Sequence, residues 1–583
     1  MQVMQLAREA SAYKKQGELI NCITSVKKAI ELGESIHMDP GFVTGKLKNY
    51  LSNRYSNIGD FDRAIELNLV LNEFYLKTED YNRYIWSFNN LGVNHFNQGN
   101  FEEARNYYQE GYLFANKLNL KSDQIDLLDG LVLSNVKLKE FDIAKKYLRR
   151  EKELLNESSD EFKDIQTVYY CYTKAQYYKG LGKSNDAVLW YEKSIAKAKE
   201  LEDRKLVNGA VDLAELYYML GRYKKATEKL NEVFQFYDIG TNPLIKDPYL
   251  LQAYFISAKV LIEQNKPSKA LEMVRKAEDQ AAFFHAKYMF AESKFFLDDY
   301  RRKNLELGVK ANYLLWEKTN KVEYVQDALL MADLAKSNVL KERLLSSQRL
   351  KVKSVENDDV TLRLQLIYQL NAAEQKGDKI AVVNTRDRLD SLNNKLGLTE
   401  LESSFSLSDL QQLLKLNQKV LEYFFVDSTC YQFTVTNSSV SAANLGVVRQ
   451  SDVVDFYSLV SNPRSDVASY SKVGSYLYAK LIKESLGGAG EIVIVPDGVL
   501  SLLPFGALPT NAGNGKWASM KFLQQDCTLS YGFSLHSLAQ QKMEKQVKPY
   551  EAGEVEDDGY PDGLTAELAV SKLIELKKKD MLL

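Results

Sequence analysis

A phrase that recurs about every 40 residues constrains the fold of this chain more than any other feature. Its full form is Gly-x-aromatic-x-x-Ala, as in Gly59-Asp-Phe-Asp-Arg-Ala64 and Gly99-Asn-Phe-Glu-Glu-Ala104. With weaker copies included, the small residue that closes the phrase stands at Cys22, Ala64, Ala104, Ala144, Ala187, Ala226 and Ala270. The intervals of 39 to 44 residues are typical of a repeat architecture.

Each copy is expected to form a helical hairpin. The glycine ends the first helix, the aromatic residue packs back over the turn, and the alanine lets the second helix approach closely. A single hairpin cannot bury its apolar face, so successive hairpins must stack. The sequence therefore predicts an α-helical solenoid of about seven hairpins over residues 1–285.

The first helices of such an array line its concave side, where partners can bind. Helical spacing places one polar and aromatic stripe on these helices, and the candidate groove residues are Asn49, Asn53, Asn89, Asn90 and Phe96. Side-chain amides can hydrogen-bond the backbone of an extended peptide whatever its sequence. We therefore expect a peptide or protein partner, with a merely solvated polar face as the alternative.

The phrase fades after residue 285, but the helical period continues. Residues 286–400 are predicted to form a helical extension or coiled-coil arm. It includes a long amphipathic helix from Asp327 to Leu345 and a charged helical hairpin from Asn357 to Leu398.

After Gly397 the period changes from 3.6 to 2, which predicts an α/β block over residues 401–583. Strands are expected at 420–426, 430–436 and 442–448, followed by helices at 452–459 and 473–484. The apolar run from Ile492 to Val495 suits a strand covered on both faces, and Pro496-Asp-Gly498 ends it. An acidic loop at 548–563 and a helix at 564–583 would follow, leaving the sheet incomplete where the sequence stops.

Composition excludes several classes of function. With 76 basic and 78 acidic residues the net charge is −2, so nucleic acid is not an expected partner. No run of apolar residues is long enough to span a membrane, and the chain is expected to be cytoplasmic. The four cysteines are scattered without a CxxC pair, so we expect neither a metal site nor a cofactor. The oligomeric state stays open.

The repeats resemble the tetratricopeptide repeat. Leu91-Gly92 with Gly99, Phe101, Ala104 and Tyr108 match its pattern, although the family's usual period is about 34 residues. The helices should therefore be longer than usual.

The C-terminal block resembles the CHAT domain, a caspase-like module related to clan CD cysteine peptidases and joined to tetratricopeptide arrays in bacteria. The residues that carry the resemblance are Asp333-Leu-Ala-Lys-Ser-Asn-Val-Leu340, Val420-Leu-Glu-Tyr-Phe-Phe425, Ile494-Val-Pro-Asp-Gly498 with Leu503-Pro-Phe505, and Leu529-Ser-Tyr-Gly-Phe-Ser-Leu-His-Ser-Leu538. The resemblance implies a histidine and cysteine dyad, but the family places both later than Leu583.

No catalytic residue is therefore assigned. A substitute dyad of Cys527 and His536 is disfavoured, because Cys527 opens a strand and a parallel sheet carries its sites at the other strand ends. Two functions remain. The protein is an interaction solenoid joined to a peptidase-type domain that is inactive in this chain, or it is a purely structural scaffold with a non-catalytic α/β remnant.

Overall fold

The computed structural model describes residues 1–15, 19–158, 160–203, 205–237, 247–287, 291–336, 358–376, single or paired positions between 381 and 395, and residues 406–488, 490–511 and 516–539. The expected loop at 548–563 and helix at 564–583 lie outside these residues.

The helices pair in sequence into hairpins, seven of them between Gln2 and Lys287 and one more after that. The first helices are α1 (Gln2–Lys15), α4 (Asn49–Ile58), α6 (Tyr81–Asn97), α8 (Lys121–Lys137), α10 (Asp160–Gly180), α12 (Lys205–Met219), α14 (Pro248–Glu263) and α16 (Ala291–Thr319). The second helices are α2 (Leu19–Ser35), α5 (Phe61–Lys77), α7 (Phe101–Lys117), α9 (Phe141–Asn156), α11 (Ser184–Glu200), α13 (Tyr223–Phe236), α15 (Pro267–Lys287) and α17 (Val322–Leu334). α3 (Pro40–Phe42) and the π-helix η1 (Val43–Lys48) lead directly into α4. The helical repeat solenoid is confirmed.

One residue in each of the most regular turns adopts a left-handed conformation. Gly59, Glu79, Gly99, Asn119 and Lys139 have φ between 55° and 86° and follow one another at intervals of 20 residues. The turn inside a hairpin and the turn between hairpins therefore have the same form. Two 17-residue helices, such as α6 and α7, and two three-residue turns make up the 40-residue repeat. Glycine marks some of these turns because it reaches positive φ without a steric penalty.

The small residue that closes each copy of the phrase is fully buried. Its exposure is 0% at Cys22, Ala64, Ala104, Ala144, Ala187, Ala226 and Ala270. Close helix approach also depends on two glycines around Tyr108 of α7. A Cβ added at Gly92 of α6 or Gly130 of α8 would lie 2.5 or 2.4 Å from Cε1 of that ring. One tyrosine thus fills the space among three helices.

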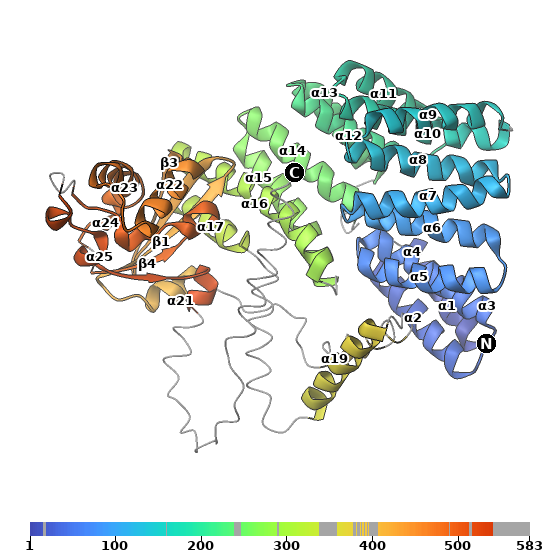
Figure 1. The fold of residues 1–583 in the computed structure, drawn as a ribbon, viewed down its shortest axis with the longest axis horizontal. Coiled ribbons are helices and arrows are strands. Elements are labelled where there is room, and N and C mark those ends of the chain that lie inside the picture. The colour runs from blue at the N-terminus through green and yellow to red at the C-terminus, as the bar shows by residue number, and fades with distance from the viewer. Residues whose placement is uncertain are drawn as a thin grey trace.

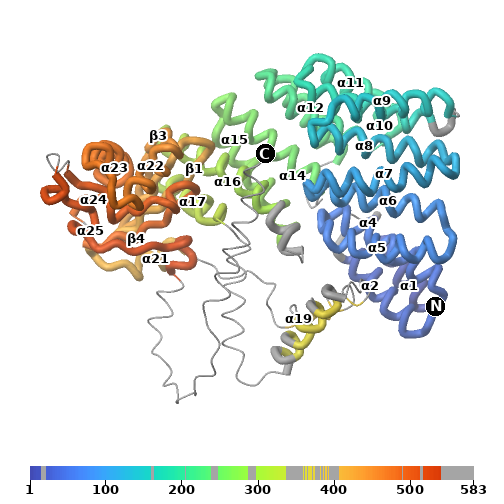
Figure 2. Tube along the Cα trace, in the orientation of Figure 1, coloured from blue at the N-terminus to red at the C-terminus, as the bar shows by residue number. Residues whose placement is uncertain are grey.

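The first helices of neighbouring hairpins contact one another from α6 through α16. We call the surface formed by α4, α6, α8, α10 and α12 the inner surface. α16 also contacts α5, which brings the end of the array back to its second hairpin. Figures 1 and 2 show α14, α15 and α16 in green between the earlier hairpins and the C-terminal sheet.

The C-terminal region contains a small mixed sheet, which confirms the expected α/β block. Its strands are β1 (Gln418–Val426), β2 (Thr429–Val435), β3 (Val440–Val447), β4 (Glu491–Val495) and β5 (Thr528–Tyr531). They lie in the order β3-β2-β1-β4-β5. β1, β4 and β5 run parallel, whereas β2 is antiparallel to both of its neighbours.

Further helices accompany the sheet: α21 (Leu407–Gln412), α22 (Gln450–Ser461), α23 (Val467–Leu481), α24 (Lys483–Leu486) and α25 (Leu523–Asp526). The helix α19 (Asp358–Lys376) is drawn apart from the sheet in Figure 1. α23 begins at Val467 rather than at the expected Val473. The reason is a cap, since the Asp466 carboxylate accepts a hydrogen bond from the Ser469 N–H at 2.8 Å. α17 ends at Leu334, and residues 337–345 of the long helix expected there lie outside the described residues.

Both faces of the sheet are covered, by elements from different parts of the chain. One face packs against α22 and α23 through residues such as Leu421, Phe456 and Leu477. The other face shares a core with the last solenoid hairpin, where Val420 and Phe424 of β1 join Leu305, Val309 and Leu329 of α16 and α17. The last solenoid hairpin and the sheet are therefore built on one apolar core, whereas the earlier hairpins pack in clusters of their own.

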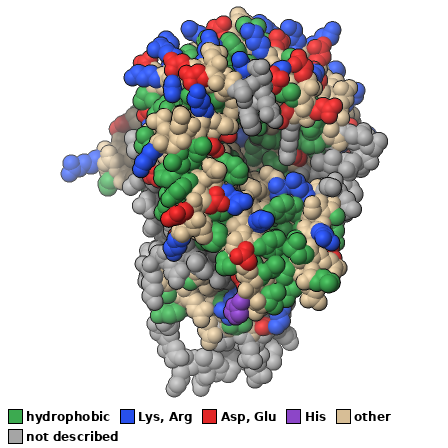
Figure 3. Space-filling model, turned by 90° about the vertical axis from the view of Figure 1, so that its right-hand side faces the viewer, with side chains coloured by type: hydrophobic (Ala, Val, Ile, Leu, Met, Phe, Trp, Pro, Cys, Tyr) green, Lys and Arg blue, Asp and Glu red, His purple; other side chains and the backbone are tan. Residues whose placement is uncertain are grey.

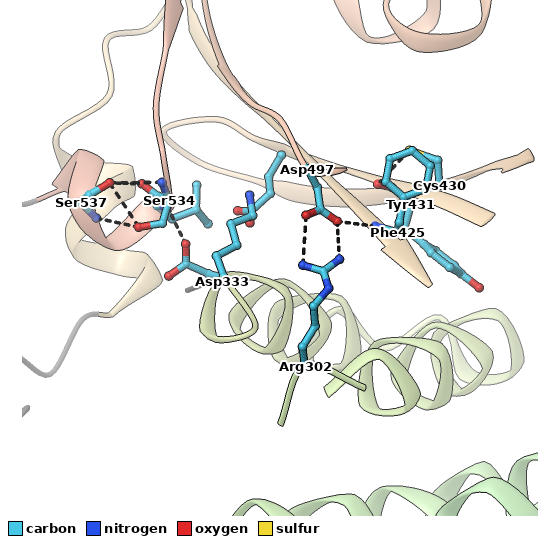
Figure 4. A network of polar contacts seen from close by, with 11 residues as sticks. Arg302, Asp333, Phe425, Cys430, Tyr431, Asp497, Ser534 and Ser537 are labelled. Atoms are coloured by element: carbon cyan, nitrogen blue, oxygen red, sulfur yellow. Dashed lines mark hydrogen bonds and ion pairs between the residues drawn. The ribbon is translucent and has the colours of Figure 1, made fainter. Parts of the chain in front are cut away.

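Buried polar contacts reinforce this junction (Figure 4). Asp497, directly after β4, accepts two hydrogen bonds from the Arg302 guanidinium at 3.1 and 2.8 Å and one from the Phe425 N–H at 2.8 Å. Asp333 of α17 accepts one from the Leu535 N–H at 2.6 Å.

An ion pair adds to these contacts. The Lys336 Nζ lies 2.8 Å from the Glu422 carboxylate of β1, and both side chains are nearly inaccessible to solvent. Because removal of either charge would leave the other buried and uncompensated, the pair favours one fixed docking of hairpin and sheet.

Candidate functional site

A cavity of about 370 Å³ opens on the inner surface between α4, α6 and α8. Its walls are polar: they consist of Asn49, Asn53, Tyr75, Arg83, Trp86, Ser87, Asn89, Asn90 and Asp126. Four of the five residues predicted to form the groove are therefore brought together around one space. Phe96 is not among them, because it packs edge-on against Phe101 with ring centroids 5.2 Å apart.

The four asparagines have amide groups available for binding. Their side chains are half-buried, and within the described part of the chain none of these amides has a hydrogen-bond partner. By contrast, Tyr75 donates to the Gly45 carbonyl at 2.8 Å, and Ser87 accepts from Asn72 at 2.8 Å. The cavity wall is thus held in place by other residues, and the amides remain free.

The rest of the inner surface is different, because its polar side chains bond to one another across helices. Asp129, which is the repeat equivalent of Asn89, accepts a hydrogen bond from Thr173 of α10 at 2.6 Å. Asp212 of α12 accepts from Tyr172 at 2.7 Å and from Gln176 at 2.9 Å. The free amides are therefore a local property of α4 and α6.

One side of the cavity is acidic and aromatic. Trp86 is 53% exposed, yet its Nε1 donates to the Asp123 carboxylate at 2.7 Å, which fixes the indole. Asp126 lies one turn further along α8. No hydrogen bond or ion pair reaches its carboxylate within the described residues.

The pKa of Asp126 is raised to about 7, by burial first and then by the charges of Asp129 and Asp123. The Asp126 side chain is nevertheless exposed to solvent, so the raised pKa reflects the protein atoms and carboxylates around the group and not its enclosure.

Among the described residues that line the wall, Arg83 is the one cationic side chain, and it donates to the Asp80 carboxylate at 2.7 Å.

Sequence reasoning did not include Asp126, Arg83, Tyr75, Trp86 and Ser87 in the predicted site. Trp86 shares a helical face with Asn89 and could have been chosen from spacing alone. Asp126 could not, because the repeat equivalent of Asn89 on α8 is Asp129, which accepts a hydrogen bond from Thr173, and it is Asp126 that lines the cavity.

The cysteines show no sign of nucleophilic activation. All four are buried, and burial raises the pKa of the Cys171, Cys430 and Cys527 thiols. The Cys527 Sγ donates to the Leu523 carbonyl at 3.6 Å. His95 stacks on Tyr107 with centroids 5.2 Å apart, and burial lowers the pKa of its imidazole.

Charged side chains of both signs are interspersed over the solenoid face in Figure 3. Among the described residues, no group of three or more His, Cys, Asp or Glu side chains is placed to hold a metal ion. No helix in the same part of the chain is long and apolar enough to cross a membrane.

Two segments of the chain match models of the tetratricopeptide repeat, residues 85–118 and residues 168–196. They correspond to α6 with α7 and to α10 with α11. No curated protein matches the chain.

Several solved structures are similar to part of this chain. A tetratricopeptide repeat protein from Parabacteroides merdae is 17% identical, covers 52% of this chain and 99% of its own, and has a TM-score of 0.32. NprR in complex with its cognate peptide NprX is 18% identical, covers 57% and 92%, and has a TM-score of 0.34. The Rap conjugation gene regulator of plasmid pLS20, solved with the Phr* peptide, is 13% identical, covers 69% and 98%, and also scores 0.34. TM-scores this low assign no function to the chain.

Proposed function

We propose that this protein binds a peptide, or an extended segment of a partner protein, in the cavity between α4, α6 and α8. Asn49, Asn53, Asn89 and Asn90 would hydrogen-bond the backbone of the bound segment. An amide side chain both donates and accepts, so it matches the N–H and C=O groups of an extended chain in either direction.

The observation that carries the proposal is the contrast along the inner surface. Polar residues on α8, α10 and α12 bond to one another and stabilise the stack, whereas the four amides on α4 and α6 have no such partner. A cavity of this size with unbonded amides on its wall is suited to a ligand that supplies the missing groups. A solvated polar face would not require the amides to converge on one cavity.

The proposal can be tested by selection from a displayed library of random dodecapeptides, with the intact chain as the target. The Kd of each enriched peptide is then measured against the double variant Asn53→Ala/Asn89→Ala. Each backbone hydrogen bond contributes about 1 kcal/mol, so loss of two amides should weaken binding roughly 30-fold.

The matched control is the double variant Asn106→Ala/Asn116→Ala. These two asparagines are exposed on α7, so their loss removes the same amide groups away from the cavity and should leave the Kd unchanged. If no peptide is enriched, or if the enriched peptides bind the first variant as tightly as the unaltered chain, the proposal is wrong. In that case the purely structural scaffold is the better description.

We also propose that the C-terminal region is related to the caspase-like CHAT domain. Supporting this, the segments that carry the resemblance meet at one junction: Asp333 and Lys336 come from the first, Glu422 from the second, Asp497 from the third and Leu535 from the fourth. Their residues thus serve to dock the sheet on the solenoid. Burial raises the pKa of the Cys527 thiol, so this cysteine is a poor nucleophile. In this proposal the C-terminal region has a docking role and Cys527 takes no part in peptide cleavage.

A further inference from the structure

We propose that the cavity receives a cationic side chain, arginine or lysine, of the bound peptide, held between the carboxylates of Asp126 and Asp123 and the indole of Trp86. This inference rests on the proposed peptide binding and specifies which peptides bind.

The cavity wall carries a carboxylate that no cation of the wall neutralises. Arg83 is neutralised by Asp80, and Asp126 has no cationic partner among the described residues. Lys205 of α12 interacts with Asp129, Asp212 and Asp203 and lies 4.6 and 4.5 Å from the ring centroids of Tyr169 and Tyr172. Once ionised, the Asp126 carboxylate is therefore available to a cationic group of a ligand.

Trp86 supplies the second contact. A half-exposed tryptophan would ordinarily sample several rotamers, but its bond to Asp123 holds the ring in place. A carboxylate at the indole N–H also makes the ring a better partner for a cation, because it adds electron density to the π face. The preorganised ring and the free carboxylate are both on the wall of one cavity, so one cation can contact the two together, and its bond to the carboxylate is charge-assisted.

The same arrangement disfavours the opposite charge. A glutamate or a free carboxyl terminus would enter beside Asp123 and Asp126 and meet no unpaired cation on the wall. The site therefore discriminates by repulsion as well as by attraction.

The test uses three nonapeptides of glycine, serine and alanine that are acetylated, amidated and labelled with the same neutral dye. Their central residue is arginine, citrulline or glutamate; citrulline has the shape of arginine without its charge. Binding to the full chain is followed by fluorescence anisotropy at pH 8, where Asp126 is ionised. We expect the arginine peptide to bind about tenfold more tightly than the citrulline peptide, and the glutamate peptide to bind most weakly.

The variant Asp126→Asn should bring the arginine and citrulline peptides to within about twofold of each other and leave the citrulline peptide unaffected. Asp142→Asn, at an exposed position on α9, should preserve the tenfold preference. Equal binding of all three peptides that is lost in Asn53→Ala/Asn89→Ala would refute the cationic site and keep the proposed function. Absence of binding for all three up to millimolar concentration would overturn both.

Discussion

The contact between Arg302 and Asp497 should be a strong polar link between the last solenoid hairpin and the sheet. Asp497 is nearly buried, with 7% of its side chain exposed, while 30% of the Arg302 side chain remains accessible. Hydrogen bonds to charged groups contribute about 1.5–3 kcal/mol each, and desolvation of both ions offsets part of the two bonds. We expect a coupling free energy of about 2 kcal/mol between the residues.

The measurement is a double-mutant cycle with Arg302→Leu and Asp497→Asn. Asparagine retains an oxygen that can accept from the Phe425 N–H, so the cycle isolates the contact with arginine. Unfolding free energies come from urea titration followed by circular dichroism and tryptophan fluorescence. Coincident transitions are expected if the core that the last hairpin shares with the sheet couples their unfolding.

The chain contains a matched control in Arg275 and Asp327, which link α15 to α17. Their N–O distance is 2.7 Å, but the two side chains are 59% and 41% exposed. Exposed pairs of this kind contribute about 0.2–1 kcal/mol and weaken in salt. If the Arg302 and Asp497 coupling is no larger than that of the control, or vanishes at high salt, the assignment of a buried link is wrong.

Three other predictions follow from individual contacts. Gly130→Ala should lower the free energy of unfolding by about 1–3 kcal/mol despite its better helix propensity, because the new Cβ meets Tyr108; an unchanged urea midpoint would mean that the ring can move aside. The pKa of Glu306 is raised to about 7 by burial, which outweighs its ion pair. Its folded pKa lies above the unfolded value, so stability is lost as pH rises through 7, and Glu306→Gln should stabilise the chain by about 1–2 kcal/mol at pH 8 but not at pH 4. A cysteine-directed activity probe should leave Cys527 unlabelled; labelling that His536→Ala abolishes would establish a dyad.

Sequence reasoning predicted the repeat and the strands because each depends on local chemistry. The recurring small residue must be buried wherever two helices approach closely, and the run from Ile492 to Val495 is apolar on both faces because both faces are covered. The left-handed turns at Glu79 and Lys139 could not be predicted from the sequence. Neither residue type favours positive φ, and only the packing of the flanking helices imposes that conformation.

The candidate site was predicted in part for a related reason. Helical spacing identified asparagines on one face, and four of them do line the cavity. Whether a polar side chain can bind a ligand depends on whether another helix supplies it with a hydrogen-bond partner. That partner cannot be predicted from one stretch of sequence. Asn89 and Asp129 occupy equivalent positions, but only Asp129 has a threonine within reach.

The shared core has a consequence for the order in which the chain is made. Synthesis proceeds from the N-terminus, so α16 and α17 leave the ribosome before any strand exists. β1 begins at Gln418, 84 residues after the end of α17 at Leu334. At about 5–20 residues per second, the apolar surface of Leu305, Val309 and Leu329 stays uncovered for roughly 4 to 17 seconds. A nascent chain of this length offers chaperones a defined hydrophobic patch, and the sheet then assembles on a helical surface that is already folded.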